Sequence, residues 1–193
     1  MKPTKVLIIA AHPDDDVLGC GGYLAKYSQQ KETRVVFIAE GTTCRYKAKE
    51  IGGNAARDAL HLRTESSVKS LELLGVGDVE FYNLPCGRLD QEPILEINQI
   101  LEKEINGFQP ELIFTHAEHD VNNDHRIVYR SVQMATRPGS LCCVGKIMSF
   151  EVLSSTEWNY EKPFEPNHYE LLTEEEVQRK WEALACYGSE IRE

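Results

Sequence analysis

A histidine and three consecutive aspartates follow the first apolar stretch of this chain. Residues 6–9 are Val-Leu-Ile-Ile, and His12, Asp14, Asp15 and Asp16 come soon after them. An imidazole and three carboxylates at the end of a buried strand cost free energy unless something compensates their charge. A divalent metal ion is the simplest compensation, so this cluster indicates a metal site.

A second polar cluster follows another apolar stretch, at residues 112–115, and runs from His116 to His125. Because both clusters come after predicted strands, we expect them to form one site. His12 and Asp15 are three residues apart across a strand-to-helix turn, and His125 opens a later helix. Two imidazoles and one carboxylate are a common catalytic zinc set that leaves the fourth position for water. We therefore predict a Zn²⁺ site, with Fe²⁺ or Co²⁺ as alternatives.

The other acidic side chains of the two clusters have predicted supporting roles. Asp14, next to a ligand, is the expected general base for a water whose pKa zinc lowers to about 7. Asp124, beside His125, is expected to orient an imidazole through its ring N–H. Asp16 is expected to do the same or to cap the first helix. Taken alone, residues 12–16 are also compatible with a helix-capping turn that binds no metal.

Strand and helix patterns alternate along the whole chain. Continuous apolar runs and amphipathic segments predict strands at 5–10, 34–39, 79–83, 112–115 and 146–153, and helices at 17–29, 55–74, 93–106, 124–135 and 173–186. A polar loop with glycines covers residues 41–54. This alternation predicts an α/β fold with a mostly parallel sheet covered on both faces. Ligands bind such sheets at the carboxyl ends of the strands, where both polar clusters lie.

Length and composition are typical of one soluble globular domain. The chain has 193 residues, a net charge of −10 and six cysteines without a CxxC pair. The negative charge argues against nucleic acid as a partner, because phosphate binding favours a basic surface. Without a signal peptide or a transmembrane segment, we expect a cytoplasmic protein with reduced thiols. The adjacent Cys142 and Cys143 are expected to pack within a strand. We also expect the protein to form a homo-oligomer.

Two motifs carry a resemblance to a known family. Residues 11–16 read AHPDDD, and residues 119–128 read HDVNNDHRIV. With these motifs the chain resembles the PIG-L/LmbE-like N-deacetylases, zinc enzymes that remove acetyl groups from N-acetylglucosamine-type sugars. Further similarity at residues 135–138, 154–158 and 164–167 extends the resemblance over nearly the whole chain.

The resemblance implies a Rossmann-like three-layer sandwich and a single deacetylase domain over residues 1–193. It also implies that His12, Asp15 and His125 are the zinc ligands and that Asp14 is the base, as their spacing predicts. The implied reaction is removal of an acetyl group from an N-acetylated amino sugar by activated water. The substrate would be free, nucleotide-linked or part of a glycan precursor.

Three departures from the family pattern affect this interpretation. Many relatives have histidine where this chain has Asn122, and an asparagine cannot deliver a proton at neutral pH. Asp14 and His116 are therefore the candidates for the general acid. Cys86 replaces the aspartate of a Leu-Pro-Asp motif, which removes a carboxylate that could hold a sugar hydroxyl. Family chains commonly continue beyond the helix that ends near Cys186, so we expect a domain shortened at its C-terminal end.

Candidate substrate contacts lie around the predicted ligands. Asn122 and Asp120 are expected to bind a polar substrate or to hold their loop, and His116 to line the pocket or face outward. Arginines bind phosphate through a forked guanidinium, and the candidates for this role are Arg45, Arg63 and Arg137. Surface ion pairing is the alternative for each of the three.

Four other functions compete with the deacetylase interpretation. A deacylase of a non-sugar amide, such as a thiol conjugate, would use the same catalytic groups, and a non-catalytic relative would bind only the metal. A magnesium phosphotransferase is disfavoured by the two histidines, because Mg²⁺ prefers oxygen ligands. A nucleotide-binding module is disfavoured because residues 19–22 lack the G-x-G-x-x-G spacing.

Overall fold

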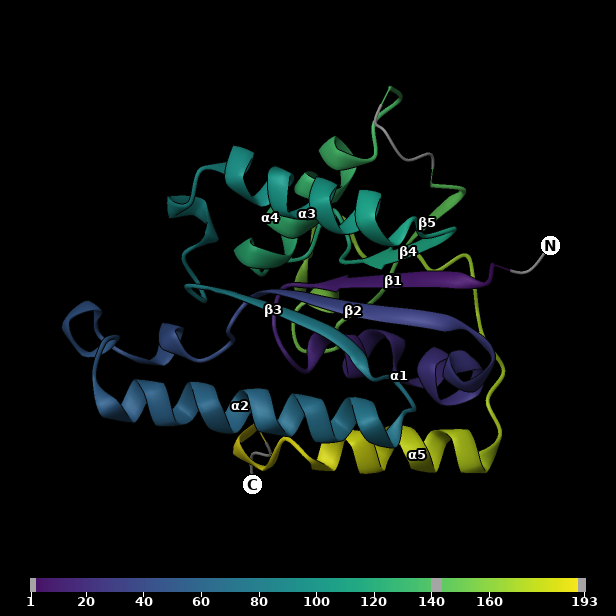
Figure 1. The fold of residues 1–193 in the computed structure, drawn as a ribbon, viewed down its shortest axis with the longest axis horizontal. Helices are drawn as coiled ribbons and strands as arrows, with labels where there is room; N and C mark the ends of the chain where they lie inside the picture. The colour runs from purple at the N-terminus through teal and green to yellow at the C-terminus, as the bar shows by residue number, and fades with distance from the viewer. Residues whose placement is uncertain (1–2, 140–143, 191–193) are drawn as a thin grey trace.

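The computed structural model describes residues 3–139 and 144–190 and contains a five-stranded sheet with helices on both faces (Figure 1). The strands are β1 (Lys5–Ala10), β2 (Glu32–Ala39), β3 (Asp78–Leu84), β4 (Leu112–Thr115) and β5 (Lys146–Ser149). The helices are α1 (Asp15–Tyr27), α2 (Asn54–Leu73), α3 (Ile94–Phe108), α4 (Asn123–Ala135) and α5 (Glu174–Ala185). Every predicted strand and helix is present, and all strand pairings are parallel, which confirms the predicted α/β fold. Among these helices none has the length and apolar character needed to cross a bilayer.

The last strand is shorter than its sequence pattern predicts. β5 ends at Ser149, whereas the prediction extends to residue 153. Ser155 and Thr156 both donate their N–H groups to Val152 O, so the chain turns at this point instead of continuing the strand. Cys142 and Cys143 lie outside the described residues.

Alternate residues of β1 point into two separate cores. Val6 and Ile8 face a core built with α1, α2 and α5, while Leu7 and Ile9 face a core built with α3 and α4. All four side chains are fully buried. A strand buried on both faces is expected to be continuously apolar, as residues 6–9 are. The result is a three-layer sandwich (Figure 1).

The strand order places the ends of β1 and β4 next to each other. The sheet has the order β3-β2-β1-β4-β5, so the chain winds outward from β1 in one direction and then crosses to the other side at β4. The crevice between the carboxyl ends of two such strands is the usual ligand site of an open parallel sheet. His12 follows β1 and His116 follows β4, so both predicted clusters border this crevice.

Helix α5 leads the described chain toward the same region. It packs against α1 and α2 below the sheet (Figure 1). Its N-terminus has the expected capping box, in which Glu176 N donates to Thr173 Oγ1 at 3.3 Å and Thr173 N donates to Glu176 Oε2 at 2.7 Å. After α5 the chain passes the buried Tyr187 into a short 3₁₀ turn, η6 (Gly188–Glu190).

Gly19 of α1 provides a test of the packing behind the site. A Cβ at this position would lie 2.3 Å from Phe150 Cδ2. The Phe150 ring also meets His116 edge-on, with centroids 4.8 Å apart, so it has little room to withdraw. We expect Gly19→Ala to lower the free energy of unfolding in urea by about 1–3 kcal/mol.

Gly107 is the matched control for this substitution. It lies in α3, and nothing is within 4 Å of a Cβ built there. Gly107→Ala should raise the free energy of unfolding by about 0.5–1 kcal/mol, because alanine favours the helix. A Gly19→Ala protein as stable as the wild type would contradict the close contact with Phe150.

Candidate metal centre

The three predicted ligands converge on one buried point between β1 and β4. Asp15 Oδ2 is 3.2 Å from His12 Nδ1 and 3.2 Å from His125 Nε2. One ligand atom from each of the three residues lies within 4.8 Å of the others. The β1–α1 turn supplies His12 and Asp15, and the first turn of α4 supplies His125. The fold therefore brings together residues that are more than a hundred positions apart in the sequence.

The chemistry and spacing of this set fit zinc. His125 Nε2 is buried and has no hydrogen-bond partner among the described residues, because its approach to Asp15 lies outside hydrogen-bond geometry. Two ligand atoms each about 2.1 Å from a tetrahedral ion lie roughly 3.4 Å apart, close to the observed separations. Two further sets of possible ligands exist, His12–Cys86–Asp124 and His116–Asp120–His125. Their carboxylates already accept several hydrogen bonds from the protein.

A carboxylate holds the outward-facing nitrogen of each histidine ligand. Asp124 Oδ2 lies 3.0 Å from His12 Nε2, and Asp120 Oδ2 lies 3.0 Å from His125 Nδ1. Burial alone would lower the pKa of His12, but its contacts with Asp124 and Asp15 outweigh burial and raise the pKa to about 10, so a bound metal would have to displace the proton of Nδ1. The carboxylates accept the N–H of each ring, so His12 Nδ1 and His125 Nε2 are left to bind a metal. The imidazole that Asp124 contacts is thus that of His12 and not that of its neighbour His125.

Asp120 holds its loop and His125 rather than facing a substrate. It is fully buried, and its Oδ2 accepts hydrogen bonds from Ser155 Oγ at 3.0 Å and Thr156 Oγ1 at 2.7 Å. The N–H of Asn122 donates to its Oδ1 at 2.8 Å. The sequence reasoning assigned no role to Ser155 and Thr156, although they belong to one of the stretches that resemble the family.

His116 lies behind the ligands. It is fully buried, its Nε2 accepts the N–H of Ala11 at 2.8 Å, and its ring stacks on His125 with centroids 3.9 Å apart. Burial, together with the positive charge of His125, lowers its pKa well below the usual histidine value. His116 is therefore a neutral packing partner of His125. It neither lines the pocket nor faces outward, so neither of the two expected roles is seen.

Asp14 is placed beside the ligands but keeps contact with solvent. Its side chain is 18% exposed, and its Oδ2 pairs with Arg63 Nη1 at 3.2 Å. The backbone φ of Asp14 is +115°, a conformation that costs a non-glycine residue about 1–3 kcal/mol. Burial and the charge of Asp15 raise its pKa to about 7, against the opposing effect of Arg63. A carboxyl group with this pKa can exchange a proton near neutral pH.

Asp16 supports the backbone of Asp14 and reaches no imidazole. It is fully buried, and its Oδ1 accepts the N–H of Asp14 at 3.2 Å. Burial raises its pKa to about 7. The predicted roles of Asp16 were to orient an imidazole or to cap the first helix, and its contact with Asp14 N favours capping at the start of α1.

Two of the three candidate arginines share the carboxylate of Glu190, and one of them, Arg63, also contacts Asp14. Arg63 is buried and pairs with both Asp14 and Glu190, each at 3.2 Å. Arg45 pairs with the same Glu190 at 2.5 Å. No sequence pattern pointed to Glu190. The turn η6, which follows α5, brings its carboxylate to the two arginines.

Arg137 is the arginine that the structure does not bring to the site. It lies beyond the C-terminus of α4, whereas His125 lies in the first turn of that helix. The intervening helix is roughly 18 Å long, at about 1.5 Å per residue. Its guanidinium pairs with Glu102 at 3.4 Å, which is the surface ion pair given as the alternative.

Asn122 caps α4 and leaves its amide nitrogen for another group. Its Oδ1 accepts the N–H of Asp124 at 3.0 Å. Its side chain is partly exposed, and its Nδ2 has no partner among the residues that the structure describes. Asn122 is therefore the predicted substrate contact that keeps a donor available.

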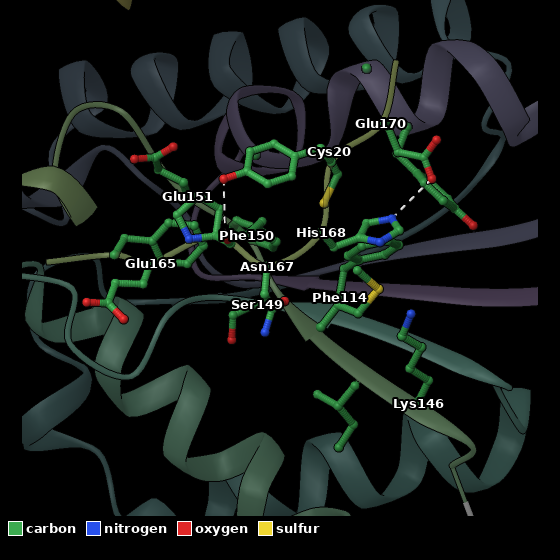
Figure 2. Close-up of a pocket in the computed structure, with 18 of the residues that line it drawn as sticks. Cys20, Phe114, Lys146, Ser149, Phe150, Glu151, Glu165, Asn167, His168 and Glu170 are labelled. Atoms are coloured by element: carbon green, nitrogen blue, oxygen red, sulfur yellow. Dashed lines mark hydrogen bonds and ion pairs between the residues drawn. The ribbon is translucent and has the colours of Figure 1, made fainter. Parts of the chain in front are cut away.

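A cavity of about 760 Å³ lies beside the metal centre, between α1, β5 and residues 164–172 (Figure 2). Its wall includes Cys20 of α1, Phe114 of β4 and Phe150, but none of the three predicted ligands. Phe150 connects the two regions, because its ring lines the cavity and also meets His116. The cavity therefore lies next to the candidate metal centre, and the predicted metal ligands do not line it.

Known proteins are similar to this chain over most of its length. Residues 7–136 match the family model described as PIG-L, GlcNAc-PI de-N-acetylase. The chain is 27% identical over 192 residues to the uncharacterized deacetylase YaiS of Escherichia coli (strain K12), with 97% of this chain and 92% of that protein covered. It is 24% identical to the probable N-acetyl-α-D-glucosaminyl L-malate deacetylase 2 of Bacillus anthracis, with 96% and 81% covered.

A solved structure shows the same fold at low sequence identity. The N,N′-diacetylchitobiose deacetylase from Pyrococcus horikoshii, in complex with its inhibitor, matches with a TM-score of 0.79 and 20% identity. The match covers 100% of this chain and 72% of that one. The family model itself spans more than half of the chain and includes His12, Asp15 and His125. On this basis, the chain belongs to the PIG-L family of deacetylases.

Proposed function

We propose that this protein is a zinc-dependent N-deacetylase of an N-acetylated amino sugar, formed as a single domain. The observation that carries the proposal is the position of the orphaned His125 Nε2. It lies with His12 Nδ1 and Asp15 Oδ2 in one buried cluster, directly beside the partly exposed Asp14. Amide hydrolysis by activated water needs metal ligands, an ionisable carboxyl group and access from solvent, and this cluster offers all three.

Zinc would be held by His12, Asp15 and His125, and it would supply a Lewis acid that activates water and polarises an amide carbonyl. Asp120 and Asp124 keep the two imidazoles in the orientation that leaves one nitrogen of each for the metal. This division of roles follows from the hydrogen bonds at the two rings.

Asp14 serves as both base and acid in this proposal. Its carboxylate takes the proton of the attacking water, and the resulting carboxylic acid donates that proton to the departing amine. The raised pKa, about 7, suits both steps. His116 was the other candidate for the acid, but its fully buried ring is closed to a substrate.

Asn122 is the proposed donor to the acyl oxygen. Its Nδ2 carries two N–H groups, and its Oδ1 is fixed by Asp124 N, so the amide is held in one orientation. A fixed donor stabilises a developing oxyanion without having to reorient during the reaction.

An amino-sugar substrate is supported by the family model and by two of the similar proteins. The family model is named for an N-acetylglucosaminyl lipid, and the relatives from Bacillus anthracis and Pyrococcus horikoshii are named for N-acetylated sugars.

A substrate panel tests the proposal. The zinc-loaded protein should release free amine from N-acetylglucosamine, N,N′-diacetylchitobiose or UDP-N-acetylglucosamine, as detected with an amine-reactive fluorophore. Release should stop when a chelator removes the metal and return when Zn²⁺ is added. Turnover of N-acetylcysteine conjugates but of none of these sugars would replace the sugar substrate with a non-sugar amide. No turnover of either class by zinc-loaded protein would count against the proposed activity.

A further inference from the structure

Two cysteines from separate loops lie side by side near the metal centre. Cys44 belongs to the 3₁₀ turn η2 (Thr43–Arg45) after β2, and Cys86 follows β3. Their strands pair in parallel up to Ala39 and Leu84, so the two loops leave the sheet side by side. Cys44 is exposed, whereas Cys86 is buried. The packing is close, since a Cβ on Gly87 would lie 3.0 Å from Cys44 Cβ.

One buried carboxylate holds both loops in this arrangement. Glu40, at the end of β2, accepts the N–H of Cys86 at 2.9 Å and the N–H of Thr43 at 3.2 Å through the same Oε1. Its Oε2 accepts the N–H of Thr42 at 2.6 Å. The two loops that carry the thiols are therefore held together by the fold. Glu40 follows a buried strand just as His12 does, so its position in the sequence was a usable signal.

The thiol pair is linked to a predicted zinc ligand through the main chain. Cys86 Sγ lies within 4.8 Å of ligand-type atoms of His12 and Asp124. The next residue, Gly87, donates its N–H to Asp124 Oδ2 at 2.6 Å. The same oxygen holds His12 Nε2 at 3.0 Å. A shift of the Cys86–Gly87 peptide therefore acts on the carboxylate that orients His12.

We propose that Cys44 and Cys86 form a reversible disulfide that weakens metal binding at this centre. The bond itself is independent of the proposed function, whereas its effect on the metal rests on the proposed zinc site. A disulfide needs the sulfurs roughly 2 Å apart, closer than two free thiols can approach, so the two loops must close on each other. That closure shifts Cys86 and Gly87 relative to Asp124, which accepts the N–H of Gly87.

The oxidant is a low-molecular-weight disulfide such as oxidised glutathione. The Cys44 thiolate attacks one of its sulfurs, which forms a mixed disulfide and releases one glutathione thiolate. Cys86 then displaces the second glutathione thiolate and closes the internal bond. The protons of the two cysteines end on the two glutathione thiols, so the protein loses two electrons and the glutathione disulfide gains them.

Cys44 is suited to be the attacking group. It is exposed to solvent, and the hydrogen bond from Cys86 lowers the pKa of its thiol to about 6 despite partial burial. The thiolate is the reactive form of cysteine. The buried Cys86 is the resolving partner, because it is shielded from glutathione in solution and attacks the Cys44 sulfur once the mixed disulfide has formed there.

The test treats the folded, zinc-loaded protein with oxidised glutathione and maps its peptides without reduction. We expect a cross-linked peptide pair containing Cys44 and Cys86, lighter by two hydrogens than the two reduced peptides together. In competition with a zinc-binding dye, the oxidised protein should bind Zn²⁺ about 10–100-fold more weakly, the loss typical when the orientation of a ligand is disturbed. Dithiothreitol should restore the wild-type affinity.

Single-cysteine variants provide the controls. Cys44→Ser should keep its zinc affinity under the oxidant, and Cys186→Ser, which removes a partly exposed thiol after α5, should respond like the wild type. Failure to find the Cys44–Cys86 pair while other thiols are glutathionylated would overturn the proposal. A Cys44–Cys86 disulfide that forms but leaves the zinc affinity unchanged would also overturn the proposal. If the reduced protein bound no zinc, the proposed function would fail, and the peptide map would still decide whether the disulfide forms.

Discussion

Replacing Asp14 with asparagine should lower kcat for deacetylation by about 100- to 10,000-fold, the usual contribution of a general base. Asparagine has nearly the same shape and can still accept a hydrogen bond from Arg63, which lies 3.2 Å from Asp14 Oδ2. It cannot take a proton from water at neutral pH. The variant should retain its full zinc content, because Asp14 is not among the three converging ligands. Steady-state amine release and elemental analysis measure the two effects separately.

An exposed aspartate on the same side of the sheet gives the control. Asp58 lies on the surface of α2, so Asp58→Asn changes the net charge by the same amount without touching the site. It should retain the wild-type kcat. A zinc-loaded Asp14→Asn protein that turns over as fast as Asp58→Asn would remove Asp14 from the mechanism.

The candidate metal centre could be located from the sequence because its residues come soon after strongly apolar strands. Residues 6–9 and 112–115 are buried on both faces of the sheet, which gives them an unmistakable continuous pattern. In a parallel sheet such strands end at one edge, so polar residues directly after them must be close in space. Local spacing and the common edge of a parallel sheet together therefore predicted that His12, Asp15 and His125 meet at one point.

The supporting contacts could not be predicted in the same way, because they depend on tertiary structure far along the chain. Asp120 and Asp124 are similar in sequence, but Asp120 is held by Ser155 and Thr156, while Asp124 is held by Gly87. No local pattern states which acidic residue serves which imidazole.

The arginines show the same limit for side-chain partners. Arg63 and Arg137 both end up in ion pairs, yet only Arg63 is buried beside Asp14. The difference follows from the direction of α4, which carries Arg137 away from the site, and from α5, which delivers Glu190 to it. Both are consequences of helix packing that residue type and spacing leave open.

Removing the imidazole of His125 should abolish stoichiometric zinc binding. His125 Nε2 is the buried nitrogen without a hydrogen-bond partner, and it meets the same Asp15 oxygen as His12 does. His125→Ala leaves only two of the three ligands, so its loss of affinity should exceed the 10–100-fold typical of an outer-sphere change. Elemental analysis after dialysis gives the metal content. Added Zn²⁺ should raise the Tm of the wild type, because it binds the native state, and leave the Tm of the variant unchanged.

Two further variants separate ligation from positioning and from folding. His61→Ala removes an exposed histidine of α2 and should keep both the zinc content and the Tm response of the wild type. Asp120→Asn keeps all three ligands but weakens the contact at His125 Nδ1, so it should lower zinc affinity by about 10–100-fold without abolishing binding. The expected order of affinities is therefore His61→Ala, then Asp120→Asn, then His125→Ala. Full zinc content in a cooperatively folded His125→Ala protein would show that the ion is not held by His125. His125→Ala is the variant in this series that removes a predicted ligand atom, so such a result would contradict the proposed ligand set.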